Sequence, residues 1–284
     1  MNYLRLLLPL LLFYGCNKEK LKAPDAFFIK PQSITVSTTT LQGTGSHKIT
    51  DLWYYVNNSF KGAFPTENTL PIPSSGQTQV LIYPGIKNNG ISATRLAYEF
   101  YEPITIDTAI ASGNTFYPNL IFKYKSAAVF KWVEDFEGFG TTSGITITKT
   151  NNSDTTFTIL NKVSNPSADV FEGNRCFYFG LDANRAIGVF QSTALYNLPK
   201  GGAPVYLELN YKCTQPFEVG VYSTTGGYTY ASSVNTSPNW NKIYIHLSTA
   251  VTTNLGSLVG LYFRSVKQVD NPEFFIDNIK IVSY

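Results

Sequence analysis

The sequence predicts an all-β protein built from two sandwich domains. Aromatic residues make up 15% of the 284 residues, and charged residues only 14%. Aromatic and β-branched side chains pack well on a pleated sheet, and strong helix formers are few in this chain. Apolar and polar residues alternate in many stretches, which is the period of a strand. The length exceeds what one small sandwich needs, so we expect two domains.

The first fifteen residues predict an export signal. One cation, Arg5, precedes an apolar stretch at residues 6–14. That stretch is far shorter than the ~20 residues that a membrane-spanning helix needs. No other segment of the sequence is apolar enough to cross a membrane. We therefore expect residues 1–15 to be a signal peptide that is removed on export.

The expected cleavage point lies between Gly15 and Cys16, and it lacks the Ala-x-Ala-like pattern of a secreted protein. A small residue before a cysteine resembles a bacterial lipobox, in which a diacylglycerol is attached to the cysteine, although Phe13 and Tyr14 depart from the usual pattern. The alternative is an ordinary signal peptide with an incidental cysteine. We expect Cys16 to carry the lipid and residues 16–25 to form a tether. The expected location is the cell envelope, at the outer membrane.

The mature chain has little net charge. Loss of the signal peptide leaves 21 basic against 19 acidic residues, because Arg5 is the one charged residue in it among 22 basic and 19 acidic in all. With no basic run, nucleic acid is not an expected partner. Cys176 and Cys213 lie in strand-like stretches, and in an export compartment a disulfide between them is as expected as two separate buried thiols.

The first domain is expected at residues 26–128. Strand-like stretches such as "SITVSTTTL" and "NLIFKYK" are separated by turn clusters such as "PIPSSGQ" and "KNNG". In "DLWYYV", Leu52 and Val56 share one face and Trp53 and Tyr55 the other, so we expect both faces to be covered. The size and the strand pattern indicate an immunoglobulin-like β-sandwich.

The second domain, residues 129–284, has the clearest alternation. Every second residue is apolar in "VYLELNYK", and "FEVGV", "KIYIHL" and "VGLYF" repeat this period. Strands with one apolar and one polar face are typical of an antiparallel sandwich. We therefore expect side chains such as Tyr206, Glu208, Tyr244 and His246 to face water.

Four motifs in this half carry a family resemblance. "EDFEGFG", "FEGNRCFYFGL", "PNWNKIYIHL" and "PEFFIDNIKIVSY" together resemble the galactose-binding-like jelly roll, a superfamily with many carbohydrate-binding modules and bacterial surface adhesion domains. The resemblance covers residues 134–284. The whole chain resembles two-domain lipoproteins of Bacteroidota whose role is unassigned. The resemblance implies a C-terminal jelly-roll sandwich and a surface location.

The resemblance also implies a structural calcium ion. In calcium-binding members, an acidic residue of the early "FEG" segment and the aspartate of the last-strand "DN" segment supply ligands, and these match Glu137 and Asp277. Asp277 shares the parity of Phe275 and Ile279, so we expect it in a core-facing row, where a carboxylate needs a partner. Backbone carbonyls would have to complete the six to eight oxygens that calcium takes. The alternative is that Asp277 accepts backbone hydrogen bonds near a bulge and Glu137 is solvated.

Aromatic and planar polar side chains on the polar strand faces suit a sugar, because rings stack on C–H faces and planar polar groups bind hydroxyls. Two of the tyrosines lie on an expected hairpin, for which a solvent-exposed turn with ordinary cross-strand pairs is the alternative. The expected ligand-binding residues are Tyr222, Tyr228, Tyr230, Tyr262 and Arg264.

An enzyme is not expected. The two histidines, His47 and His246, fall in different domains. The sequence therefore offers too few histidines for a histidine-based zinc site or a serine triad. No nucleophile-elbow, zinc-protease or phosphate-loop motif is present. The acids Glu134, Asp135 and Glu137 indicate a solvated or calcium-binding edge more than a glycosidase pair. The expected function is non-catalytic binding of a glycan or another envelope component; the alternative is a structural lipoprotein that makes protein–protein contacts and takes no small ligand.

Overall fold

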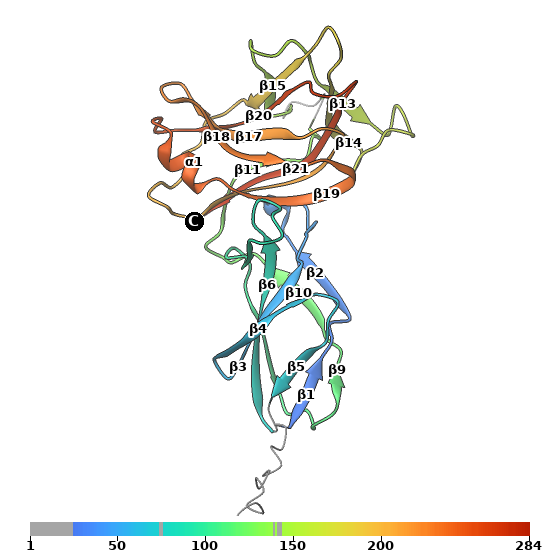
Figure 1. The fold of residues 1–284 in the computed structure, drawn as a ribbon, viewed down its shortest axis with the longest axis vertical. Coiled ribbons are helices and arrows are strands. Elements are labelled where there is room, and N and C mark those ends of the chain that lie inside the picture. The colour runs from blue at the N-terminus through green and yellow to red at the C-terminus, as the bar shows by residue number, and fades with distance from the viewer. Residues whose placement is uncertain (1–24, 74–75, 139, 141–143) are drawn as a thin grey trace, which may run out of the picture.

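The computed structural model describes residues 25–284 except 74–75, 139 and 141–143. The expected signal peptide, Cys16 and nearly all of the tether lie outside the described residues. The described chain forms two β-rich bodies stacked along the long axis of the molecule (Figure 1). Among its helices none has the length and apolar character to span a membrane. The predicted all-β fold class is confirmed.

The N-terminal domain is an immunoglobulin-like β-sandwich. Its strands are β1 (Ala26–Ile29), β2 (Ser33–Ser37), β3 (Asp51–Val56), β4 (Ser59–Pro65), β5 (Leu70–Pro73), β6 (Thr78–Lys87), β7 (Arg95–Ala97), β8 (Ile104–Thr108), β9 (Thr115–Phe116) and β10 (Asn119–Lys123). One sheet has the order β4-β3-β6-β7, with β8 also paired with β6. The remaining strands pair as β5-β1-β9 and β10-β2. A 3-10 turn, η2, covers Thr40–Gln42.

The β3–β4 hairpin follows from a tight turn between the two strands. Asn57 and Asn58 form its two-residue turn with φ of 47° and 65°, a left-handed conformation that asparagine tolerates and that matches the twist of the flanking strands. Trp53 and Tyr55 are only partly buried. Both of their rings contact the ring of Phe60, which is 50% exposed. The expectation that both faces of β3 are covered was wrong, because no further layer packs on this aromatic face in the described residues.

The C-terminal domain is a jelly-roll sandwich. Its elements are β11 (Val129–Glu134), β12 (Ile147–Lys149), β13 (Thr158–Asn161), β14 (Arg175–Gly180), β15 (Ile187–Ser192), β16 (Val205–Cys213), β17 (Phe217–Ser223), β18 (Gly227–Val234), β19 (Ser237–His246), the helix α1 (Ser248–Thr253), β20 (Gly260–Val266) and β21 (Glu273–Ser283). One sheet has the order β13-β14-β21-β16-β19, with β11 also on β21, and the other β12-β15-β20-β17-β18. All of these pairs are antiparallel.

The predicted alternation is confirmed on the inner faces of these two sheets. Leu207 and Leu209 from β16 pack in one buried cluster with Val219 from β17 and Phe263 from β20. On β16, β19 and β21, however, the outer face is buried as well. Fully buried aromatic rings from both domains meet there, namely Tyr98, Phe100, Tyr101, Tyr206 and Tyr244.

The expectation that Tyr206, Glu208 and Tyr244 face water was therefore wrong. Their exposed fractions are 2%, 0% and 1%, because the N-terminal domain packs on this sheet face and its core cluster includes both tyrosines. His246 stays partly exposed at the edge of the contact, where its ring lies 4.9 Å from that of Tyr206. The two domains thus share one apolar cluster.

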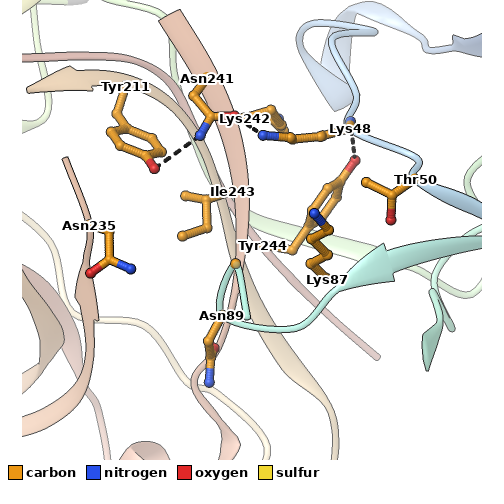
Figure 2. A pocket seen from close by; sticks show the side chains of 11 residues that line it. Lys48, Thr50, Lys87, Asn89, Tyr211, Asn235, Asn241, Lys242, Ile243 and Tyr244 are labelled. Atoms are coloured by element: carbon orange, nitrogen blue, oxygen red, sulfur yellow. Dashed lines mark hydrogen bonds between the residues drawn. The ribbon is translucent and has the colours of Figure 1, made fainter. Parts of the chain in front are cut away.

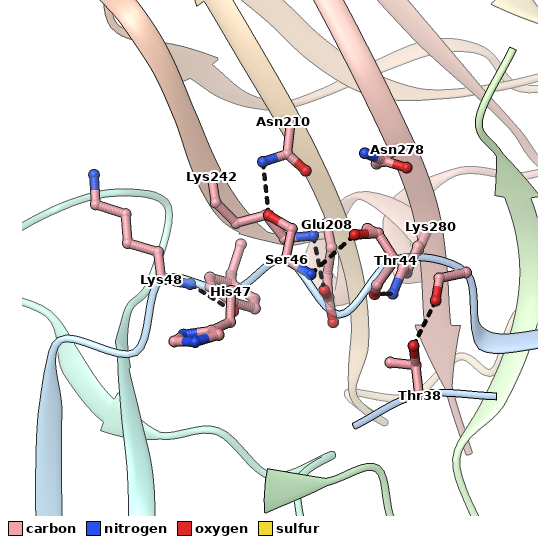
Figure 3. A network of polar contacts seen from close by, with 12 residues as sticks. Thr38, Thr44, Ser46, His47, Lys48, Glu208, Asn210, Lys242, Asn278 and Lys280 are labelled. Atoms are coloured by element: carbon pink, nitrogen blue, oxygen red, sulfur yellow. Dashed lines mark hydrogen bonds and ion pairs between the residues drawn. The ribbon is translucent and has the colours of Figure 1, made fainter. Parts of the chain in front are cut away.

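A buried carboxylate sits inside this contact (Figure 3). Glu208 accepts hydrogen bonds from the hydroxyls of Tyr98 and Tyr124, each at 2.8 Å, and its Oε2 lies 3.2 Å from the Lys242 ammonium. Burial opposes ionisation, but the charges of Lys242 and Lys280 outweigh it and hold the pKa of Glu208 below its usual range. An ionised Glu208 therefore links groups from both domains.

Lys280 completes this cluster. Its ammonium donates to the backbone carbonyl of Thr44 in the N-terminal domain and lies 5.2 Å from the centre of the Tyr124 ring. Burial, followed by repulsion from Lys242, lowers the pKa of Lys280 to about 7, although Glu208 acts in the opposite direction. The two lysines face one carboxylate in a site that excludes water.

A bulge in β21 changes which of its residues face the core. Asn278 has φ of 52°, and the register between β16 and β21 shifts here. Ile276 and Ile279 consequently both lie in the sandwich core, whereas Phe275 packs in a separate cluster on the outer side. The expectation that Asp277 shares the core-facing row of Ile279 was wrong, because the bulge reverses the alternation between them.

The two remaining cysteines are free thiols, so the disulfide alternative was wrong. β21 lies between β14, which carries Cys176, and β16, which carries Cys213. Strands two apart are separated by about 9.5 Å, beyond the Cα–Cα reach of a disulfide. Cys213 belongs to the sandwich core and Cys176 to the outer cluster. Burial raises the pKa of Cys176 to about 12 and that of Cys213 to about 11.

Candidate functional site

The structure brings all five predicted ligand-binding residues onto one sheet face. Tyr222 of β17, Tyr228 and Tyr230 of β18, and Tyr262 and Arg264 of β20 point away from the core, and their strands are adjacent. We call these five residues the tyrosine face. It belongs to the sheet β12-β15-β20-β17-β18, opposite to the sheet that contacts the N-terminal domain. The N-terminal domain therefore leaves it uncovered.

Two glycines set the orientation of two of these rings. A Cβ at Gly220 would lie 2.5 Å from the ring of Tyr262, and a Cβ at Gly260 would lie 2.3 Å from the ring of Tyr222. Each ring thus lies over a glycine on the neighbouring strand, where any larger residue would displace it. This arrangement resembles the cross-strand pairing in which an aromatic ring covers a glycine.

Three of the rings form a connected group. The Tyr228 ring lies 5.0 Å from that of Tyr262, edge to face, and 6.0 Å from that of Tyr222. Tyr228 and Tyr230 are 46% and 56% exposed, whereas Tyr262 is 4% exposed. Burial, followed by the charge of Glu218, raises the pKa of Tyr262 to about 12. Its hydroxyl therefore stays protonated and neutral at physiological pH.

Hydrogen bonds hold the rings in place. The Tyr222 hydroxyl donates to the Ser192 carbonyl at 2.6 Å, and the Tyr228 hydroxyl donates to Gln191 Oε1 at 3.1 Å. Gln191 was not predicted from the sequence; its place opposite Tyr262 follows from the β15–β20 register, which the sequence does not give. These bonds reduce the freedom that the rings would lose on binding a ligand.

A charged pair borders the rings. Arg264 donates to Glu218 Oε2 at 2.8 Å, and both side chains remain about two-fifths exposed, at 41% and 40%. Glu218 was also missed, because a strand with alternating residues does not reveal its cross-strand partner. Planar guanidinium and carboxylate groups beside rings can bind the hydroxyls of a ligand whose apolar face stacks on the tyrosines.

The predicted calcium ligands lie near each other but in different environments. Glu137 Oε1 accepts from the backbone N–H groups of Asn174 and Arg175, at 2.7 and 2.8 Å, and the Arg175 guanidinium lies 3.4 Å from Oε2. Asp277 is 1% exposed and accepts from the N–H groups of Glu172, at 3.2 Å, and Asn278, at 2.8 Å. Arg175 therefore neutralises Glu137, and the structure gives Asp277 only neutral donors.

Asp277 is a buried carboxylate that no cation pairs with in the described part of the chain. Burial, followed by the charges of Glu172 and Glu137, raises its pKa to about 8. Oxygen donors around an uncompensated acid fit calcium chemically. Within the described ranges, however, no group of three His, Cys, Asp or Glu residues is arranged to hold a metal ion. Glu172, which the sequence did not single out, is the acid whose charge raises the pKa of Asp277 most.

Comparisons with known proteins give structural similarities alone. No protein family and no curated protein matches the chain. The K1 cleaved adhesin domain of Lys-gingipain from Porphyromonas gingivalis aligns with 14% identity and a TM-score of 0.41, over 56% of this chain and 99% of that one. A family 61 carbohydrate-binding module in complex with β-1,4-galactotriose aligns with 15% identity and a TM-score of 0.33, over 49% and 87%. A family 29 module complexed with mannohexaose aligns with 9% identity and a TM-score of 0.34, over 55% and 92%.

Proposed function

We propose that this protein is a non-catalytic glycan-binding module of the cell envelope, with the tyrosine face as its binding surface. The observation that supports this function is the gathering of four tyrosine rings and the Arg264–Glu218 pair on one uncovered sheet face. Exposed rings supply stacking surface for sugar C–H faces at little cost in side-chain entropy, and the charged pair supplies planar hydrogen-bonding groups. Tyr228 and Tyr230 are the most exposed rings and the expected points of contact.

The test is a glycan array followed by titration of any glycan that binds the mature protein. Tyr228→Ala with Tyr230→Ala is expected to weaken binding at least tenfold, because the exposed stacking surface is lost. Tyr117→Ala is the matched control, since Tyr117 is 58% exposed but lies in the N-terminal domain. A flat array at high protein concentration, or equal affinity of the double variant, would contradict the proposal.

We further propose that a lipid on Cys16 anchors this module. Two or three acyl chains hold a soluble body at a bilayer because each buried methylene contributes ~0.8 kcal/mol. Replacement of the thiol by Cys16→Ser is expected to move the protein from the membrane fraction to the soluble fraction on cell fractionation. Retention of the serine variant in the membrane fraction would argue against the lipid.

A structural calcium ion is a separate proposal, supported by the burial of Asp277 without a cationic partner among the described residues. The ion would be held by Asp277 and Glu172, with Glu137 close by, and would supply a positive charge that favours the ionised form of Asp277. Addition of calcium to chelator-treated protein is expected to raise its melting temperature, and Asp277→Asn should abolish the increase. Asp270→Asn is the control, because Asp270 is an exposed acid in a surface pair with Lys267. An identical response of the Asp277 variant would refute this ion.

Protein–protein assembly is a second candidate function, which the aromatic face of β3 and β4 favours. Trp53, Tyr55 and Tyr83 contact one another or Phe60 on the outer face of that sheet, and large exposed apolar side chains are common in protein contacts. Phe60→Ser would separate the two functions, because it should reduce assembly on cells without changing glycan affinity.

A further inference from the structure

A small cavity of about 90 Å³ lies between the two domains (Figure 2). The N-terminal domain lines it with Lys48, Lys87 and Asn89, and the C-terminal domain with Asn235 and Lys242, among others. Neither domain alone forms it. The segment that carries Asn89 is fixed on β19, where its N–H donates to the Tyr244 carbonyl at 2.9 Å.

The charges around this cavity are of one sign. Three ammonium groups line it, and its lining residues include no carboxylate. Glu208 lies behind Lys242 at 3.2 Å and compensates that lysine. Lys48 donates to the Asn241 side-chain oxygen, and the Lys87 ammonium has neither a hydrogen bond nor an ion pair among the residues that the structure describes. Burial lowers the pKa of Lys48, and the charge of Lys87 lowers it further. The two lysines are therefore close enough to repel each other, and no carboxylate lines the cavity between them.

The neutral groups around the cavity are donors as well. Asn89 Oδ1 accepts from the backbone N–H of His246 at 2.8 Å, which leaves the Nδ2 group of Asn89 to donate. The Asn235 side-chain amide has no hydrogen bond within the described chain. Asn241 Nδ2 already donates to the Tyr211 hydroxyl at 3.1 Å. The cavity thus offers ammonium and amide donors, and the matching ligand is a group that only accepts hydrogen bonds.

We propose that this cavity binds one oxyanion group, a carboxylate, sulfate or phosphate, through the ammonium groups of Lys48 and Lys87. Its size fits a single such group, since pockets for whole small molecules have volumes of about 300 Å³ or more. Because residues of both domains line the cavity, an anion bound there lies in the domain contact and stabilises it. The site is separate from the tyrosine face and does not depend on its function.

The experiment is titration of the mature protein with sodium sulfate and with sodium phosphate at constant ionic strength, maintained with sodium chloride. Calorimetry should show saturable binding, and the melting temperature should rise with anion concentration, as it does for any ligand that binds only the folded state. The double change Lys48→Gln and Lys87→Gln should weaken binding at least tenfold. The matched double control is Lys61→Gln and Lys123→Gln, two exposed lysines of the same domain outside the cavity.

Stability without anion distinguishes a binding role from a structural one. The Lys48 and Lys87 double variant should melt at or above the temperature of the unchanged protein, because a repulsion is removed; a structural role would lower it. Lys87→Glu provides a second variant, since it should pair with Lys48 and abolish sulfate binding. No saturable binding of either anion, or equal binding by the double variant, would overturn the proposal.

Two further ligands identify the source of the anion. Glucuronic acid tests a carboxylate carried by a sugar, and glucose is its uncharged counterpart. Competition of glucuronic acid with sulfate, without competition by glucose, assigns the site to acidic glycans, whereas binding of the inorganic ions alone assigns it to a free oxyanion. Competition by glucose at equal strength would overturn the proposal, because the site would then not select charge. Tyr228→Ala should leave all of these affinities unchanged.

Discussion

Glu208→Gln is expected to lower the free energy of unfolding by about 3–5 kcal/mol, because it leaves buried ammonium groups without a counter-charge. Glutamine keeps the volume of the side chain and an oxygen that can accept from the Tyr98 and Tyr124 hydroxyls, so the change isolates the charge. Lys242, which is 5% exposed, would then lose its ion-pair partner at the centre of the domain contact, and Lys280, which is 1% exposed, would lose the charge that favours its ammonium form.

Urea unfolding at neutral pH measures this loss. Glu218→Gln is the matched control, since Glu218 forms the same kind of pair with Arg264 at 2.8 Å but with both partners about 40% exposed. Exposed pairs contribute only about 0–1 kcal/mol, because water screens both charges. A Glu208 variant no less stable than the Glu218 variant would show that the buried charges do not depend on each other.

Lys280→Met is expected to change how stability depends on pH. Burial lowers the pKa of Lys280 to about 7 in the folded protein, while an unfolded lysine titrates near ~10.4. Between these values the unfolded chain binds more protons, so the free energy of unfolding rises with pH, by up to ~1.4 kcal/mol per pH unit for a full proton. Below pH 7 the lysine is charged in both states, and the full cost of burying its charge is present.

The methionine variant lacks this dependence. Its stability relative to the unchanged protein should therefore be greatest at pH 6 and should fall steadily between pH 7 and pH 9. Lys61→Met is the control, because it removes the same charge from an exposed position on β4. Denaturant titrations at unit steps of pH measure both series. A Lys280 difference that is constant from pH 6 to pH 9 would contradict the assignment of this proton.

The tyrosine face shows which parts of a binding surface can be predicted from the alternation of residues in the sequence. Alternation placed Tyr222, Tyr262 and Arg264 on outer strand faces, and the order β20-β17-β18 makes those faces continuous. The sequence did not supply Gln191 or Glu218, since cross-strand neighbours depend on register. Nor did it supply the glycines that lie beneath two of the rings, because their role appears only when Gly220 and Gly260 face an aromatic residue on the next strand.

The domain contact was missed for a different reason. On β16 the residues Tyr206, Glu208 and Asn210 alternate with apolar ones as they would on a solvated face, yet all three are buried. Glutamate and asparagine are mostly exposed and tyrosine is intermediate, so burial of their polar groups is favourable only where matching partners are present. Those partners, including Tyr98 and Tyr124, lie more than 80 residues away in the chain.

The sequence by itself determined the all-β class and the inner, apolar rows of the jelly-roll strands, because a period of two and an aromatic composition act locally along the chain. Only the tertiary structure decided which outer faces stay open, that the bulge at Asn278 turns Asp277 out of the core row, and that Cys176 and Cys213 remain apart. These outcomes depend on which strands become neighbours and on what packs above them. Such contacts join segments that are distant in the sequence. They stabilise the fold only when both segments are folded and packed together.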